Sequence, residues 1–448
     1  MALPCGLAWF SCPIVLGAFV LWDFLEHRIS ERNRKRYREF PLPRSEERAY
    51  SPSDVSIIVP TVDTDPAFSD GLSGLLRNKP LEIIIITTEE EADRVRALIR
   101  AAPVDANMGQ TELRILTVSK ANKRDQLLRG INESKGSIMA LVDDDAFWER
   151  ETVLLHLLAP FQQQDIGLVG GPTTSYLPLK RQYPGTIKPW EVAAIRLRGK
   201  RHGSMKSAYA ADGGINFCVS GVTALLRSEI ARDPAFQSAF ANDMLMGQRQ
   251  NSGDDSFITR WVLFQHLFKP QRRDGEEKPV QRKLGMQLTE GAEAGTSIMP
   301  DSRFAGQMKR WYRSGLRHRL MCLVYEPGFW GMYKTCPHMT RKMVEGMLNP
   351  VLLWVRLYCF WRTFHACPWF GSFVLSIKTY NYLDGLLEFA TEYPFVRRHL
   401  WAAVLVDRLC LVSDWYCWVT LGTEAWITRQ AVDPPAAGRS RRDRVKGE

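Results

Sequence analysis

The chain has 448 residues, is 45% hydrophobic and carries a formal net charge of +10. This length suffices for one large domain with extra elements or for two domains, and a mean hydropathy of −0.22 requires that most of the chain contacts water. The nine cysteines form no Cys-x-x-Cys pair and no Cys/His cluster at zinc spacing. They are therefore expected to be reduced thiols that serve as small apolar residues, not a secreted disulfide framework.

The first predicted element is a membrane helix at residues 1–25, because the apolar segment from Ala2 to Trp22 is long enough to span about 30 Å of hydrocarbon. Six basic residues and one acidic residue follow between Arg28 and Arg38. Positive charge after the apolar stretch favours an uncleaved anchor with a cytosolic basic linker at residues 26–50. The expected partner is a lipid bilayer and not nucleic acid, because no basic groove interleaved with aromatic residues accompanies this charge.

Residues 51–300 predict an α/β domain with a largely parallel sheet. Val55–Pro60 and Leu81–Thr88 are short β-branched runs typical of buried parallel strands. Helical stretches and further strands then alternate, beginning with a helix that acidic residues open at Glu89. Asp63 and the acidic run Asp143–Asp145 fall at or just beyond strand carboxyl ends, where ligands bind in open α/β sheets.

The last third of the chain predicts elements at a membrane. Residues 301–345 should form amphipathic interface helices, because apolar residues repeat at helical spacing between Phe304 and Val324 with basic residues among them. Residues 346–428 are predicted as membrane helices, with two to four passes in the whole chain, and residues 429–448 as a basic tail. Arg356, Asp407, Arg408 and Asp414 require these segments to face a bundle interior or to lie in the interface.

Three motifs carry the chemistry. Asp143, Asp144 and Asp145 end an apolar strand, and their mutual repulsion must be neutralised, which favours a metal. An acidic cluster alone is usually a solvated turn, but a second carboxylate pair follows in "NSGDDSFITRWVL" and a Gln-x-x-Arg-Trp sequence in "QMKRW". No comparable pattern links the histidines His202, His266 and His318, which are expected to be ordinary surface or hydrogen-bonded residues.

Together these motifs resemble those of membrane-bound, inverting family-two glycosyltransferases, the hyaluronan, chitin and cellulose synthases and related fungal polysaccharide synthases. "VDDDAFW" is similar to the family's Asp-x-Asp motif, "CVSGVTALLRSE" to its acceptor-side strand and loop, "GDDSFIT" to its catalytic-base motif and "QMKRWYRS" to its Gln-x-x-Arg-Trp helix. The resemblance extends from Ser56 to the final apolar segments. It implies a GT-A-type fold, the nucleotide-sugar-binding α/β architecture of these enzymes.

The resemblance also implies a donor site. Asp145 ligates Mg²⁺ or Mn²⁺, and Asp143 lies close to both nucleoside and metal; carboxylate oxygens suit a hard cation that stabilises a leaving diphosphate. Asp144 stands between them, so which two carboxylates act is left open. The chain departs from the family at Thr87 and Thr88, where relatives often place an Asp that contacts uracil. The remaining predicted donor contacts, each of which could instead be a solvated charge, are Asp63 near the base and Lys123, Arg124 and Arg310 at the phosphates.

On the acceptor side, the resemblance assigns the general base to Asp255, with Asp254 as the second choice. Ser220 and Gly221 are expected to shape the acceptor floor, together with Gln307. Trp311 offers a flat face for a sugar ring, or alternatively serves as a membrane-interface anchor.

The implied function is transfer of a sugar from a UDP-sugar, with inversion, to a growing β-linked polysaccharide of the cell wall or surface. The protein is expected to lie in the plasma membrane or in Golgi or ER membrane, with its catalytic domain in the cytosol. Two alternatives remain open: transfer of a single sugar to a lipid, as by ceramide glucosyltransferase, and a non-catalytic membrane scaffold.

Overall fold

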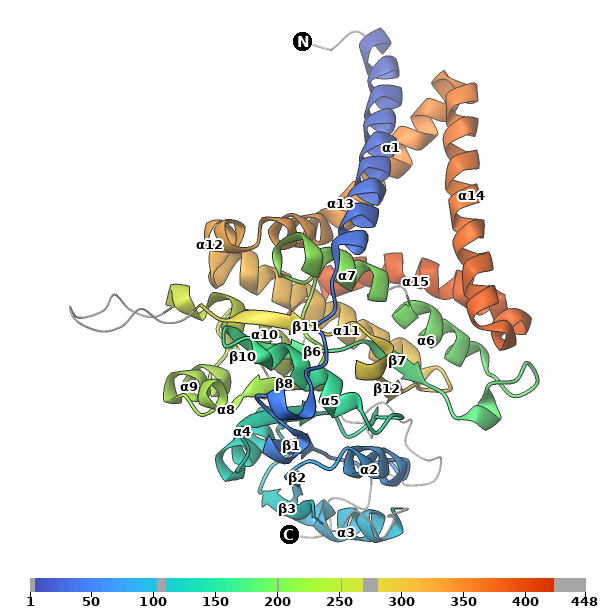
Figure 1. The fold of residues 1–448 in the computed structure, drawn as a ribbon. Helices are drawn as coiled ribbons and strands as arrows, with labels where there is room; N and C mark the ends of the chain where they lie inside the picture. Colours follow the sequence, from blue (N-terminus) through green and yellow to red (C-terminus); the bar gives the residue numbers. More distant parts are fainter. Residues whose placement is uncertain (1–4, 103–109, 200, 251, 269–280, 423–448) are drawn as a thin grey trace, which may run out of the picture.

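The computed structural model describes residues 5–102, 110–199, 201–250, 252–268 and 281–422 (Figure 1); the predicted basic tail at residues 429–448 lies outside them. A seven-stranded sheet with the order β11-β6-β8-β4-β1-β2-β3 forms its centre. The strands are β1 (Val55–Pro60), β2 (Glu82–Thr88), β3 (Glu112–Val118), β4 (Ile138–Val142), β6 (Ile166–Gly170), β8 (Thr223–Arg227) and β11 (Lys283–Met286). Only β8 runs antiparallel to its neighbours, β4 and β6. The predicted α/β fold with a mostly parallel sheet is confirmed.

Both faces of this sheet are covered, as a parallel sheet requires. Ile57 and Val59 of β1 pack on one face and Ile58 on the other, because successive side chains of a strand point to opposite faces. The helices that contribute to the first face are α2 (Phe68–Arg77), α3 (Ala92–Ala101) and α5 (Val153–Leu158). The second face is covered by α4 (Lys123–Glu133), α8 (Ser228–Ala231), α9 (Pro234–Ala241) and α10 (Asp254–Phe268).

Two small sheets flank the main one. A three-stranded sheet orders β5 (Ala146–Phe147), β12 (Ala294–Ser297) and β7 (Thr173–Tyr176) as β5-β12-β7. It continues the chain from the acidic run, so that Ser297 N donates to Asp145 O across it. A hairpin of β9 (Met244–Leu245) and β10 (Gln248–Arg249) precedes α10.

A helical layer lies beside the α/β unit. Its helix α11 (Arg303–Leu320) carries the Gln-x-x-Arg-Trp sequence and packs against α15 (Leu400–Val419), which in turn packs on α6 (Pro189–Gly199). Phe304, Met308 and Val406 are buried where these helices meet. A short π-helical segment (Met321–Tyr325) and α12 (Gly328–Thr335) follow α11, and α7 (Arg201–Asp212) packs along α1 (Cys5–Arg36).

Three long helices, α1, α13 (Pro337–Ala366) and α14 (Pro368–Glu392), extend away from the α/β unit (Figure 1). They pack through Leu16, Cys359 and Val374. Two predicted boundaries differ: α1 continues through Arg36 into the expected linker, because its basic and acidic residues extend the helix, and α13 crosses the boundary at 345/346. Among the described helices, none combines the length and the apolar character needed to cross a membrane.

Candidate active site

The candidate site lies where one strand ends and two helices begin. β4 ends at Val142, and the Asp143 amide that follows donates to Val222 O at 3.3 Å, next to the start of β8. α4 begins at Lys123, behind an Asn122 side chain that accepts hydrogen bonds from the first turn. α10 begins at Asp254, after Gly253 with a φ of +76°, a conformation that favours glycine. Residues far apart in the sequence thus converge at one edge of the sheet.

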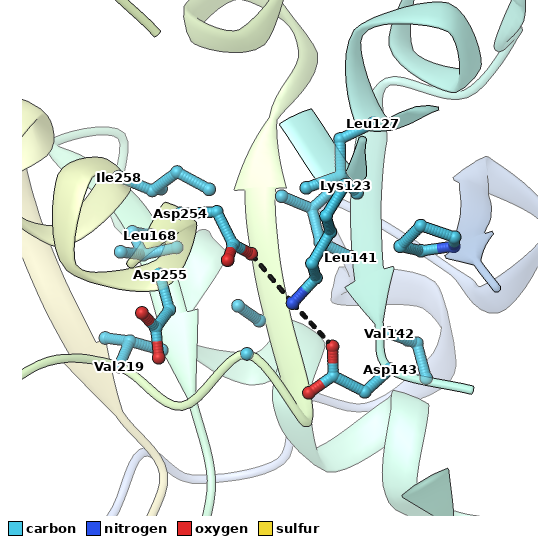
Figure 2. Close-up of a pocket in the computed structure, with 13 residues that line it drawn as sticks. Lys123, Leu127, Leu141, Val142, Asp143, Leu168, Val219, Asp254, Asp255 and Ile258 are labelled. Carbon is cyan, nitrogen blue, oxygen red and sulfur yellow. Dashed lines mark ion pairs between the residues drawn. The ribbon is translucent and has the colours of Figure 1, made fainter. Parts of the chain in front are cut away.

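A pocket at this edge holds the carboxylates around one ammonium group (Figure 2). Lys123 Nζ lies 2.8 Å from Asp143 Oδ1 and 2.9 Å from Asp254 Oδ2, so it bridges the strand end and the α10 start. Asp255 and Gly221 also line the pocket, which is partly open to solvent. A methyl group added at Gly221 would lie 3.5 to 3.6 Å from atoms of Asp255, Asp143 and Lys123. Gly221 is therefore the floor on which the predicted donor and acceptor sides meet.

The carboxylates outnumber the cation, and their pKa values reflect it. Burial, followed by repulsion from Asp145 and Asp254, raises the pKa of Asp143 despite the attraction of Lys123. Burial and then Asp254 also raise the pKa of Asp255. Burial acts in the same direction on Asp254, but Lys123 and then Arg124 outweigh it and lower that pKa. The pocket therefore favours one additional positive charge, whether a proton or a metal ion.

The three carboxylates of the acidic run are better stabilised than the sequence suggested, because each side chain has its own protein partner. Asp143 pairs with Lys123, Asp144 Oδ2 accepts from Thr61 Oγ1 at 2.6 Å, and Asp145 Oδ2 accepts from Ser297 Oγ at 3.3 Å. These contacts also stabilise the three carboxylates, and the metal that the acidic run favours stays a prediction. Within the described ranges, no group of three or more His, Cys, Asp or Glu side chains is arranged to hold a metal ion. A metal ion at the predicted ligands Asp143 and Asp145 would therefore need further ligands from substrate or water.

Asp255 is held by two sets of hydrogen bonds. Its Oδ1 accepts from Ser256 N at 2.7 Å and from Ser256 Oγ at 3.3 Å, and its Oδ2 accepts from the Cys218 thiol at 3.4 Å. Sequence reasoning missed Cys218, since it treated the cysteines as apolar residues. Its position two residues before Ser220, in the segment "CVSG" that was expected to border the acceptor, was the available signal.

Arg124 does not face the pocket, contrary to the predicted phosphate contact. Its guanidinium is 1% exposed and donates to Phe240 O at 2.8 Å and to Asp243 Oδ2 at 2.9 Å. Arg260 donates to the other Asp243 oxygen at 2.8 Å. This buried network joins α4 to the segment before α10, so we correct the role of Arg124 from ligand binding to structure.

Gln307, Arg310 and Trp311 are not among the residues that line the pocket, and their spacing puts them on one face of α11 with Ser314. Ser314 on α11 lies against Gly253, because a methyl group there would be 3.4 Å from Ser314 Oγ. Gln307, Arg310 and Trp311 precede Ser314 at helical spacing, within about 10 Å along the axis. The buried Gln307 Oε1 has no hydrogen-bond partner within the described residues, and such an atom favours a polar ligand.

Trp311 is more enclosed than the sequence suggested. The Arg198 guanidinium from α6 lies 4.4 Å from its ring centroid, and Phe304 packs edge-on at 6.2 Å. One ring face is therefore occupied by a protein cation. This contact reduces the surface available for the predicted stacking of a sugar.

The other predicted residues do not line the pocket. Asp63 follows β1 with a φ of +54°, a strained conformation for a residue other than glycine that is common near functional sites. The neighbouring Thr61 carries the hydrogen bond to Asp144. Ser220 Oγ accepts from Val222 N at 3.4 Å and so shapes the turn that presents Gly221. At the end of β2, the buried Thr87 hydroxyl has no partner within the described residues.

Comparisons with known proteins show the family of the chain. The profile of the family described as "Glycosyltransferase like family 2" matches residues 52–267. The chain is 32% identical over 421 residues to the NDP-glycosyltransferase ltbB of Aspergillus luteorubrus, covering 93% of this chain and 98% of that one. The chain belongs to glycosyltransferase family 2. It is also 31% identical over 325 residues to a type 2 glycosyltransferase of Zymoseptoria tritici, of which it spans 62%.

Among solved structures, the chain is similar to the mannosyltransferase PcManGT of Pyrobaculum calidifontis in complex with GDP-Man and Mn²⁺. The TM-score is 0.51 at 14% identity, with 90% of this chain and 99% of that chain covered. At this identity the likeness establishes a shared fold, the GT-A-like α/β architecture. The family-two glycosyltransferase therefore carries its acidic pocket at the carboxyl edge of a GT-A-like sheet.

Proposed function

We propose that this family-two glycosyltransferase moves a sugar from a UDP-sugar to an acceptor hydroxyl, with inversion, in the pocket that Lys123, Asp143, Asp254 and Asp255 form. The observation that carries the proposal is the bridge from Lys123 to Asp143 and Asp254, beside Asp255. We assign Lys123 to the phosphate, Asp143 to the metal and Asp255 to the base, and all three residues line one cavity.

On the donor side, Lys123 exchanges its carboxylate partners for the diphosphate, whose oxygens then receive its charge. Asp143 and Asp145 would hold a divalent cation, Mg²⁺ or Mn²⁺, which would stabilise charge on the departing diphosphate. Thr87 and Asp63, at the ends of β2 and β1, border the nucleoside. Arg310 reaches the outer phosphate from α11.

On the acceptor side, Asp255 takes the proton of the acceptor hydroxyl while that oxygen bonds to the anomeric carbon and the bond to the diphosphate breaks. Its raised pKa strengthens it as a base. Asp254 stays ionised beside Lys123 and balances its charge, so Asp254 is the second choice for the general base. Gln307 and the exposed part of Trp311 contact the acceptor sugar.

The proposed product is a β-linked polysaccharide, built by repeated transfer at the α11 face. Support comes from the position of Gln307, Arg310 and Trp311 on one stripe leading away from the base, which offers sites for a chain longer than one sugar. Transfer of one sugar to a lipid uses the same pocket and differs in product length. A scaffold without catalysis predicts that Asp255→Asn leaves the cellular phenotype intact.

We further propose that the protein works at a membrane, in the plasma membrane or an internal membrane, with the catalytic domain in the cytosol. The support is the aromatic surface of two projecting helices, α13 and α14: Trp354 is 59%, Trp361 55% and Trp369 88% exposed. Trp and Tyr side chains favour the interface between headgroups and hydrocarbon. Flotation of the protein with phosphatidylserine-containing vesicles, and its loss in a Trp354→Ser/Trp361→Ser/Trp369→Ser variant of unchanged melting temperature, tests this proposal.

The function is tested with purified protein in detergent and a panel of UDP- and GDP-sugars, with released nucleotide as the readout. We expect release from a UDP-sugar that stops with EDTA and returns with Mn²⁺ or Mg²⁺. Chromatography of labelled product then separates polymer from glycolipid. Failure of every donor to yield nucleotide in the presence of metal and native membrane extract would contradict the proposed reaction.

A further inference from the structure

The environment of Asp255 separates its two oxygens. Oδ1 is engaged by its own helix, through the amide and hydroxyl of Ser256. Oδ2 accepts the hydrogen bond from Cys218, a residue of the loop before β8 that is 8% exposed. A thiol is a weak donor, so this contact orients Oδ2 while leaving it able to accept a proton. Within the described residues, Oδ2 is therefore the oxygen that the protein leaves for chemistry.

The Cys218 loop is fixed to α10 by a second connection. Val219 N donates to Thr259 Oγ1 at 3.0 Å, and Thr259 Oγ1 donates to Asp255 O at 2.8 Å. Thr259 is fully buried, and it lies one helical turn after Asp255. The backbone on one side of Cys218 is thus tied to the turn that carries the carboxylate, so the distance from thiol to Oδ2 is set by the fold.

The other side of Cys218 is fixed to α11. The carbonyl of Phe217 is hydrogen-bonded to His318 Nε2 at 3.0 Å, and the two rings meet edge to face at 5.6 Å. Burial lowers the pKa of His318 to about 3, so the ring is neutral at physiological pH and Nε2 carries the donated hydrogen. Phe217 also packs on Gly315, where a methyl group would lie 3.3 Å from its ring. The tripeptide Phe217–Val219 therefore joins the helix with the candidate base to the helix with Gln307 and Trp311.

We infer that Cys218 is a positioning residue that aims Oδ2 of Asp255 at the acceptor hydroxyl. The inference rests on the proposed transfer reaction and adds a residue to it. In the transfer step the hydroxyl proton passes to Oδ2, the acceptor oxygen bonds to the anomeric carbon, and the electron pair of the broken bond leaves with the diphosphate. Cys218 keeps its own proton throughout and acts only through Asp255.

The test compares Cys218→Ala, Cys218→Ser and the control Cys336→Ala, which removes a buried thiol from the helical side of the core. Transfer rates are measured against donor and acceptor concentration and against pH. We expect Cys218→Ala to lower kcat about tenfold, the effect of one hydrogen bond to a charged group, with donor KM unchanged. Cys218→Ser, which keeps a donor, should recover most of the rate, and Cys336→Ala should retain it.

The pH profile provides a readout that a structural role would not change. A hydrogen bond to the ionised form favours that form, so Cys218→Ala should shift the acid limb to higher pH. The charged groups that act on Asp255, Asp254 on its own helix and Lys123 of α4, remain in every variant. If Cys218→Ala does not fold, Cys218→Val, which also lacks a donor, carries the comparison.

Two results would overturn the inference: a donor-less variant with the kcat and pH limb of the unaltered protein, or equal impairment of the alanine and serine variants. Failure of the proposed function gives a different result. In that case the unaltered protein releases no nucleotide from any donor, although its melting temperature equals those of the Cys218 variants.

Discussion

Lys123 and Arg124 are adjacent at the start of α4, yet they belong to two clusters with opposite charge balance. Lys123 bridges Asp143 and Asp254 in the pocket, where carboxylates exceed cations. Arg124 lies in a buried network in which one carboxylate, Asp243, receives two guanidinium groups. A deficit of positive charge favours binding of a cation in the pocket, whereas in the second cluster two guanidinium groups neutralise the carboxylate of Asp243 and hold the fold together. Surplus carboxylate charge, not the presence of charge, therefore marks the site.

The largest expected effect comes from the pocket side of this comparison. Asp255→Asn removes the proposed base while it keeps the size and one of the two acceptor oxygens, and transfer should fall about 10³-fold, within the range for a lost general base. Nucleotide release from a UDP-sugar measures it. Asp93→Asn, on an exposed part of α3, is the matched control and should leave the rate unchanged. A rate within tenfold of the unaltered protein would remove Asp255 from the mechanism.

The second prediction concerns the structural cluster. Arg124→Met leaves buried carbonyl oxygens and Asp243 short of a donor, so the free energy of unfolding should fall by about 3 kcal/mol, as for other broken buried ion pairs. Urea denaturation measures this change. Arg129→Met, which removes an exposed partner of Glu133 on the same helix, should cost less than about 1 kcal/mol.

Donor KM of folded Arg124→Met should stay near that of the unaltered protein. A large rise in donor KM without a loss of stability would instead return Arg124 to the phosphate site.

The third prediction concerns Lys123, the neighbour of Arg124 that lies in the pocket. Lys123→Met removes the ammonium group from between Asp143 and Asp254, and donor KM should rise about 30-fold, the effect of one lost charge-assisted contact to phosphate. Steady-state kinetics with varied UDP-sugar measures it. Lys120→Met, at an exposed position three residues earlier, is the control. Equal donor KM values for the two variants would contradict the proposed phosphate contact.

The smallest expected effect concerns the pH dependence of the transfer rate. Because burial raises the pKa of Asp255, the transfer rate should fall with decreasing pH already above the ordinary aspartate value of 3.8. A carboxyl whose pKa is raised by folding holds its proton more firmly in the folded state, so its protonation does not promote unfolding. The protonation of Asp255 should therefore lower the transfer rate at a pH at which the protein is still folded. Circular dichroism and the transfer rate are measured at each pH. Loss of the folded signal at the same pH as loss of activity would contradict this prediction.

Much of this site was predictable, because the carboxyl ends of parallel strands and the starts of the following helices meet at one sheet edge. The convergence of Asp143 with Asp254 and Asp255 follows from that rule and from the motifs. The orientation of the Arg124 side chain could not be predicted in this way. Consecutive residues of a helix point about 100° apart, and Asp243, which is far away in the sequence, determines which side chain is buried. Arg198 covers one face of Trp311 from another helix, a contact that no local pattern reveals.

The partners of the acidic run were equally hidden from the sequence. Thr61 and Ser297 are ordinary residues of loops and strand ends, and only the fold brings them to Asp144 and Asp145. The role of the Cys218 thiol also depends on a contact over 37 positions. Sequence patterns thus locate the chemical groups, whereas tertiary packing determines which oxygen of each group is available.

The most direct test of the central claim is an experimental structure of the protein with UDP and Mn²⁺. The account predicts the diphosphate beside Lys123, with the metal between its oxygens and the carboxylates of Asp143 and Asp145, and with Asp255 Oδ2 facing the open side of the pocket. A nucleotide bound elsewhere, with Lys123 still bridging Asp143 and Asp254, would contradict it.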